Sequence, residues 1–155
     1  MKRTNLLVVA ALSALLGAGC QGLLTQNMTS PSSTVSASVQ GMAGAWASVS
    51  AVTPAPAGTC TNFHWTITEF TGTSGSGSFT AACAGNLQVA GTALGTLSGT
   101  TVNWTASAVG TAAGNVTCPI SLTGTATFDG TQFRIPYSGT TCAGPISGTE
   151  ILRKG

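Results

Sequence analysis

Tryptophan and cysteine recur at one fixed spacing, and this repetition constrains the fold more than any other feature of the chain. The repeated residues are Trp46, Cys60 and Cys83, followed by Trp104, Cys118 and Cys142. In both sets the tryptophan precedes the first cysteine by 14 positions, and the second cysteine follows after 23 or 24. Coincident spacing of two scarce residue types indicates a duplicated unit. We predict two repeats, at about residues 42–98 and 100–155.

Each predicted repeat alternates apolar and polar residues with a period of two. In residues 116–128 the apolar side chains occupy even positions, and Thr or Ser occupies most odd positions. This period is typical of strands with one buried face in an antiparallel sheet. No segment after residue 40 has a helical period. The predicted strands lie near residues 43–50, 61–70, 75–83, 86–97, 100–109, 116–128, 131–139 and 145–153.

Eight strands joined by short connections describe an up-and-down meander, with four strands in each repeat. Closure into an eight-stranded antiparallel barrel removes the exposed sheet edges. A two-sheet sandwich, with one repeat in each sheet, is the alternative all-β fold. The Asp129-Gly130 dipeptide between two strands predicts a two-residue type I′ turn.

The four cysteines of the repeats are expected to form disulfides in an oxidising compartment. Three connectivities are open, and we favour Cys60–Cys83 with Cys118–Cys142 because each pair brackets one hairpin. The predicted turn places Cys118 opposite Thr141, and Cys60 has the opposite strand parity to Cys83, so each pairing requires a bulge. A zinc site is disfavoured because no CxxC spacing occurs.

The N-terminus carries a distinct signal. Lys2 and Arg3 precede an uncharged apolar run over residues 6–18, which is too short for a comfortable membrane span. Small residues then lead to Cys20 in the text Leu-Gly-Ala-Gly-Cys. This arrangement resembles the lipobox of bacterial lipoprotein precursors. The resemblance implies that residues 1–19 are a signal peptide and that the Cys20 thiol receives a diacylglyceryl group.

Two or three acyl chains on Cys20 would hold the mature chain on a membrane, at about 0.8 kcal/mol per buried CH₂. By resemblance to enterobacterial sorting, Gln21 in place of Asp after the cysteine favours the outer membrane. Residues 20–40 are uncharged and rich in Ser and Thr, and they are predicted to be a flexible tether. Residues 41–155 remain for one β domain.

The mature chain has few charges, which limits its chemistry. Three cations, Arg134, Arg153 and Lys154, face three acids, Glu69, Asp129 and Glu150, so the formal charge is zero. Nucleic-acid binding needs a cluster of cations, and none is visible in the sequence. His64 is the single histidine and lies on the Thr-bearing face of its strand. We therefore expect no enzyme activity, no metal site and no cofactor.

A small-ligand cavity inside the barrel is the remaining candidate site. The aromatic residues expected to line it are Trp65, Trp104 and Phe133. Glu69 and Glu150 share the parity of inward apolar neighbours and would add carboxylates to the cavity; alternatively, they lie on a wet rim at the strand ends. An open interior lined by the three rings would favour ligand binding, whereas rings packed against each other would indicate a filled core.

Gly44-Ala45-Trp46 on the first strand and Arg153 on the last resemble the calycin pattern of lipocalins and avidins. That resemblance implies a barrel opened by a GxW motif, a basic residue packed over the indole, and a small apolar ligand in the barrel mouth. The duplication and the cysteine framework depart from those families, so none of their ligand-contacting residues transfers to this chain.

Two functions follow from these observations. The first is a membrane-anchored envelope lipoprotein whose small barrel binds a small ligand. The alternative is a structural or protein-interaction module of the envelope with a filled core.

Overall fold

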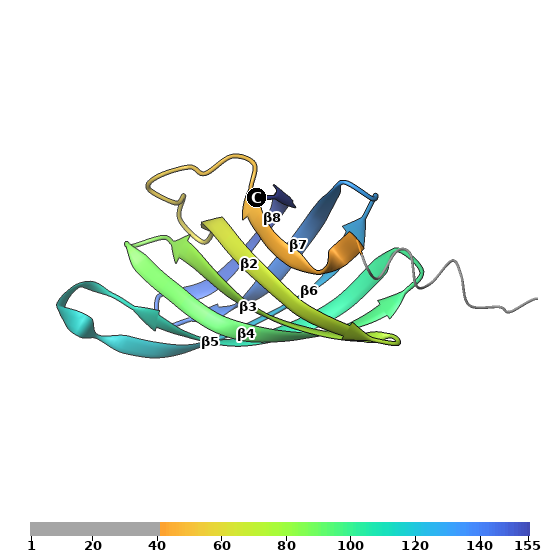
Figure 1. The fold of residues 1–155 in the computed structure, drawn as a ribbon. Coiled ribbons are helices and arrows are strands. Elements are labelled where there is room, and N and C mark those ends of the chain that lie inside the picture. Colours follow the sequence, from red (N-terminus) through yellow and green to blue (C-terminus); the bar gives the residue numbers. More distant parts are fainter. Residues whose placement is uncertain (1–40) are drawn as a thin grey trace, which may run out of the picture.

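Eight antiparallel strands follow one another in chain order around a closed barrel (Figure 1). The computed structural model describes residues 41–155. The strands are β1 (Gly44–Ser48), β2 (Cys60–Thr71), β3 (Ser74–Cys83), β4 (Leu87–Ser98), β5 (Thr101–Thr111), β6 (Thr117–Phe128), β7 (Gln132–Thr141) and β8 (Gly144–Lys154), with a 3₁₀ turn η1 (Ala113–Asn115) before β6. β1 pairs with both β2 and β8 and so closes the barrel. The predicted barrel is confirmed, and the sandwich alternative is wrong.

The predicted alternation places the core inside the barrel. In β6, Cys118, Ile120 and Leu122 are buried, whereas Pro119 and Ser121 between them and the threonines on either side are exposed. Each fully buried apolar side chain of this size contributes about 1.5–3 kcal/mol. Because almost every strand repeats this pattern, apolar side chains fill the interior and Ser and Thr cover the outside.

Glycines make room for aromatic rings on the inner face. The register pairs three inward rings with a glycine on the next strand: Phe70 with Gly75, Trp104 with Gly124, and Tyr137 with Gly148. A Cβ atom at Gly148 would lie 2.5 Å from the Tyr137 hydroxyl oxygen, too close for a real contact. At these three strand positions, glycine is therefore a packing requirement of the ring-filled barrel.

Two bulges in β2 change the side-chain parity. The first lies between Thr61 and His64 and includes Asn62 at a φ of 54°. It brings Cys60 opposite Cys83, as the sequence predicted. Backbone with positive φ suits asparagine better than most residues.

A second bulge of β2 lies between Ile67 and Glu69 and interrupts the alternation expected along this strand. Beyond this bulge, Glu69 pairs with Ser76 and Phe70 pairs with Gly75. Phe70 takes the inward position and packs against the core. The side chain of Glu69 lies outside the part of the chain that the structure describes.

The β6–β7 connection is longer than the two-residue turn predicted from its Asp-Gly dipeptide. Phe128 pairs with Phe133, so four residues separate the paired positions. The Asp129 carboxylate accepts hydrogen bonds of 2.9 Å from the backbone N–H groups of Thr131 and Gln132 and from the Thr131 hydroxyl. These bonds stabilise the wider turn. The pairing shifts by two residues, so side chains keep their predicted faces.

Both predicted disulfides, Cys60–Cys83 and Cys118–Cys142, are present. Cys142 lies in the two-residue turn after β7, beyond the paired residues, so the bulge expected for this pair is not needed. The first bond joins β2 to β3, and the second joins β6 to the turn that follows β7. The predicted duplication would produce this arrangement.

The two ends of the barrel differ in what they carry. We name the entry end for Gly41, where the described chain begins; it also holds the connections at 72–73, 99–100 and 129–131. The disulfide end holds the connections at 49–59, 84–86, 112–116 and 142–143. In Figure 1 the coloured chain begins at the right, and the long β1–β2 loop lies at the left.

Candidate functional site: the barrel interior and its seam

The tryptophans predicted to line a cavity are packed against other rings. Trp65 stacks on Phe79 at 4.7 Å between ring centroids and meets Trp104 edge-to-face at 5.5 Å. Aromatic pairs at such distances add about 0.5–1.5 kcal/mol beyond their burial. All three rings are at most 8% exposed. They fill the middle of the barrel.

A second aromatic group closes the interior toward the entry end. Phe133 lies 4.8 Å from both Trp46 and Phe128. Met42 is fully buried, and its carbonyl accepts a 2.8 Å hydrogen bond from the Trp46 indole. The segment before β1 is thereby fixed against the core, a contact that strand alternation does not predict.

A small apolar cavity of about 60 Å³ remains between these groups. Trp65, Trp104 and Phe133 line it, together with aliphatic side chains and glycine backbone. The Trp104 indole N–H is buried and lacks a hydrogen-bond partner among the described residues. Pockets for drug-sized ligands have volumes of about 300–1,000 Å³. The cavity is therefore too small for a ligand of the lipocalin type.

The basic residue over the first-strand tryptophan is Lys154 and not Arg153. The Lys154 Nζ lies 5.5 Å from the Trp46 ring centroid. Leu152 is buried, so strand alternation turns Arg153 outward and Lys154 toward the indole. A cation over an indole contributes about 0.5–1 kcal/mol at an exposed site. The predicted contact exists, but one residue further along β8.

The barrel has a seam where β1 is too short to cover its neighbours. β1 has 5 residues, whereas β2 has 12 and β8 has 11. Beyond Ser48, the long loop takes over, and the Gly58 carbonyl accepts a 2.9 Å hydrogen bond from the Ser147 N–H. Side chains must pair the other backbone groups at this seam, because unpaired buried ones are costly.

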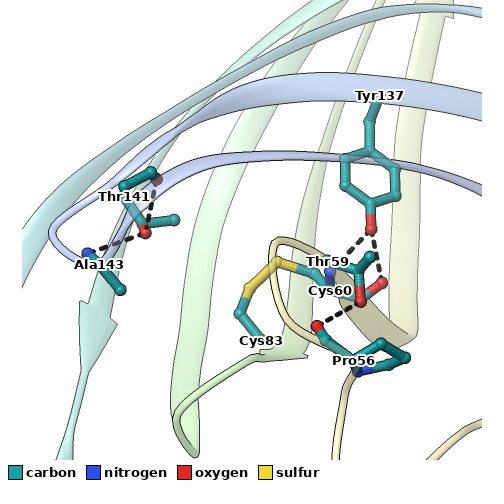
Figure 2. The surroundings of a disulfide bond; sticks show 8 residues. Pro56, Thr59, Cys60, Cys83, Tyr137, Thr141 and Ala143 are labelled. Carbon is teal, nitrogen blue, oxygen red and sulfur yellow. Dashed lines mark hydrogen bonds between the residues drawn. A yellow bond between two sulfur atoms is a disulfide. The ribbon is translucent and has the colours of Figure 1, made fainter.

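Tyr137 closes the seam at Cys60 (Figure 2). Its hydroxyl accepts a 2.7 Å hydrogen bond from the Cys60 N–H and donates one of 2.6 Å to the Cys60 carbonyl. Burial raises the pKa of Tyr137, the Cys60 hydrogen bond opposes this rise, and the nearby charge of Glu150 adds to it. One phenol thus ties β7 to the first residue of β2.

Glu150 fastens the same seam and does not line the cavity. Its carboxylate accepts a 2.7 Å hydrogen bond from the Ser48 hydroxyl, and the Ser48 oxygen accepts one of 2.8 Å from the Phe63 N–H. Phe63 lies in the first bulge, where the ladder is interrupted. Burial raises the pKa of Glu150, and the hydrogen bond from Ser48 lowers it in part. The arrangement is a structural clamp.

The structure does not bring His64 and Asp129 together as a catalytic pair. His64 is exposed on the outside of β2, and Asp129 is exposed in the β6–β7 turn at the entry end. Hydrogen bonds from the turn backbone hold the pKa of Asp129 below its usual value. Among residues 41–155, no group of three or more metal-ligating side chains is found.

The sequence pattern missed the residues that close the seam and the entry end: Met42, Ser48, Tyr137 and Lys154. One signal could have found them. The first predicted strand is shorter than its neighbours, so polar side chains nearby were candidates for unpaired backbone groups.

The lipobox with Cys20, the signal peptide at residues 1–19 and the tether at residues 20–40 lie outside the described residues. Within residues 41–155, no helix is long and apolar enough to cross a membrane. No protein-family model, curated protein or solved structure matches this chain.

Proposed function

We propose that this chain is an envelope lipoprotein, anchored in the outer membrane through acylated Cys20, whose barrel is a structural or protein-interaction module. One observation favours a structural or protein-interaction module over a barrel that carries a small ligand. Trp65 packs against Trp104 and Phe79, Phe133 packs against Trp46 and Phe128, and the two groups leave a cavity of about 60 Å³. A core filled in this way gives the barrel stability and leaves its outer surface to make contacts.

The cysteines support an address outside the cytosol. Four of the five cysteines are paired in two disulfides, and such bonds persist in oxidising compartments. Cys20 is the fifth, and the charged start, apolar run and small residues before it form the lipobox pattern. Lipidation of Cys20 accounts for the one cysteine that has no counterpart in the repeats.

The second candidate, small-ligand binding of the calycin kind, has two observations in its favour. The chain has an eight-stranded barrel with a basic side chain over the first-strand tryptophan. The Trp104 indole N–H beside the cavity also lacks a partner among the described residues. The small cavity volume favours a guest of only a few atoms, so we retain this function as the lesser proposal.

Metabolic labelling with palmitate and membrane fractionation test the anchor. We expect the wild-type chain to carry the label and to sediment with membranes. Cys20→Ala should lose both properties, whereas the control Cys142→Ala, which removes a cysteine of the Cys118–Cys142 disulfide, should keep the label. Label that persists on Cys20→Ala, or wild-type protein without label, would contradict the anchor.

A further inference from the structure

The charged side chains are distributed unequally between the two ends of the barrel. The connections of the disulfide end, at 49–59, 84–86, 112–116 and 142–143, contain no charged residue. All three cations of the described chain lie toward the entry end: Arg134 near the start of β7, and Arg153 and Lys154 at the end of β8. The fold therefore gathers cations that are 20 residues apart in the sequence.

Two of these cations, Arg134 and Arg153, are neighbours on the outer face, and Lys154 lies at the rim of the same end, over the Trp46 ring. Arg153 pairs with Ala47 of β1 and with Gln132 of β7, and Arg134 pairs with Ile151, so the two arginines are diagonal neighbours. The Lys154 Cε atom lies 3.4 Å from the point that a Cβ atom would occupy at Gly44, close to the start of β1. We name Arg134, Arg153 and Lys154 the basic patch.

Two acids lie toward the same end. Asp129 is in the β6–β7 turn, and its carboxylate is engaged by Thr131 and Gln132. Glu69 lies on β2, on the other side of β1 from the patch. A third acid, Glu150, lies on β8 itself, where its partly buried carboxylate accepts the Ser48 hydrogen bond. β7 and β8 together therefore carry three cations against one acid.

We infer that the basic patch rests on the anionic headgroups of the membrane that holds the chain. This inference depends on the proposed lipid anchor. Twenty residues, 21–40, separate Cys20 from Gly41 and span at most about 70 Å. A tether of this length keeps the barrel near the bilayer but does not set its orientation. Electrostatic attraction to the lipid surface can then set it. Anionic lipids attract cations, and the entry end alone offers a cluster of them.

A weak patch is sufficient because the anchor makes binding intramolecular. Each cation near an anionic surface contributes a factor of about five in affinity. Three cations would contribute a factor of about one hundred, so the free protein should bind weakly and measurably only at high lipid concentration. A tethered domain experiences a high effective concentration of lipid surface, so the same factor can orient it. The uncharged disulfide end would then point away from the bilayer.

Vesicle sedimentation of the unlipidated mature chain, residues 20–155 with Cys20→Ala, tests the patch separately from the anchor. The probes are vesicles of phosphatidylcholine alone and vesicles in which about one third is phosphatidylglycerol. We expect binding to the anionic vesicles that weakens strongly when the salt rises from about 0.1 M to about 1 M, since screening shortens from about 10 Å to about 3 Å. Equal binding to both vesicles would overturn the inference.

Charge variants make the assignment specific. The double variant Arg134→Gln with Arg153→Gln should lower the affinity for anionic vesicles about 25-fold. It keeps Lys154 in its contact with the Trp46 ring, so the packing at the end of β8 is retained. Asp129→Asn should raise the affinity, and an unchanged affinity in the double variant would overturn the inference. Palmitate labelling of the wild-type chain decides the anchor independently, so a failed anchor and a failed patch give different results.

Discussion

Tyr137 shows how one side chain compensates for a strand that ends early. Its hydroxyl pairs both backbone groups of Cys60, which lies beyond the reach of β1. The ring lies over Gly148, whose missing side chain leaves the space. The position therefore needs a phenol and not only an aromatic ring.

Tyr137→Phe is expected to lower the free energy of unfolding by about 2–3 kcal/mol, because it leaves a buried N–H and a buried carbonyl without partners. Urea unfolding followed by tryptophan fluorescence measures the loss. Ser138→Ala, an exposed change on the same strand, is the control and should stay within about 0.5 kcal/mol of wild type. A Tyr137→Phe variant as stable as this control would show that the seam does not depend on the phenol.

Glu150 predicts a pH dependence of stability. Its pKa in the folded protein is raised by burial, so its contribution is fully present below the unfolded pKa of about 4.3 and is lost as the pH rises through the folded pKa. Glu150→Gln keeps an oxygen for the Ser48 hydroxyl and removes the titration. We expect this variant to melt at least as high as wild type at neutral pH, with a smaller fall between acidic and neutral pH.

Asp129 gives the opposite sign and serves as the contrast. Its pKa is lowered in the folded protein, so its contribution is present above the unfolded pKa of about 3.9 and is lost as the pH falls through the folded pKa. Melting temperatures of Asp129→Asn measured across the acidic range should therefore change less with pH than those of wild type. An unchanged pH profile in both variants would refute these two assignments.

At the scale of elements, the two disulfides span loops of nearly equal length but lie in different surroundings. Their sequence separations are 23 and 24 residues. Cys60 and Cys83 are both buried, whereas Cys142 is exposed. Loop entropy alone would make the two bonds equivalent, at about 3–4 kcal/mol each. The difference in burial should therefore make their contributions to stability unequal.

We expect Cys60→Ala with Cys83→Ala to destabilise the barrel more than Cys118→Ala with Cys142→Ala. The first pair leaves a cavity among buried residues and loosens the backbone that Tyr137 holds, which adds a cost of about 1 kcal/mol or more. Urea unfolding of both double variants measures the difference. Equal losses would indicate that chain entropy is the whole contribution.

Gly148→Ala tests the pairing of rings with glycines between strands. Its Cβ atom would meet the Tyr137 hydroxyl oxygen and push the ring away from Cys60. Overpacking of this kind costs about 1–3 kcal/mol. Thr149→Ala, which is exposed on the same strand, should change stability by less than about 0.5 kcal/mol. Thermal unfolding of the two variants compares them; equal melting temperatures would exclude the packing role.

At the scale of the whole molecule, alternation and the cysteine frame predicted the barrel, all eight strands and both disulfides. The period of two survives because burial of one face is enforced along every strand. The two bulges of β2 were predicted only in part. The parity of Cys60 predicted the first bulge, but the one before Glu69 depends on which side chain the core can accept. The contact of Lys154 with Trp46 could have been predicted, because alternation from the inward Leu152 places Lys154 on the inner face.

The interior could not be predicted as open or filled from the sequence. Trp65, Trp104 and Phe133 were correctly placed on inward faces, but only the register shows which rings meet across the barrel. The roles of Tyr137 and Glu150 depend on the shortness of β1, which pairs only as far as Ser48. Both features belong to the closed barrel and to no single strand.

Titration of the folded mature chain with anilinonaphthalene sulfonate, an apolar fluorescent probe, tests the filled core most directly. The probe is larger than the cavity of about 60 Å³ and should show no saturable fluorescence increase. The double variant Trp65→Ala with Phe79→Ala removes two stacked rings and, where it stays folded, should bind the probe. Stoichiometric, saturable binding to the wild-type barrel would contradict a filled core and favour a ligand carrier.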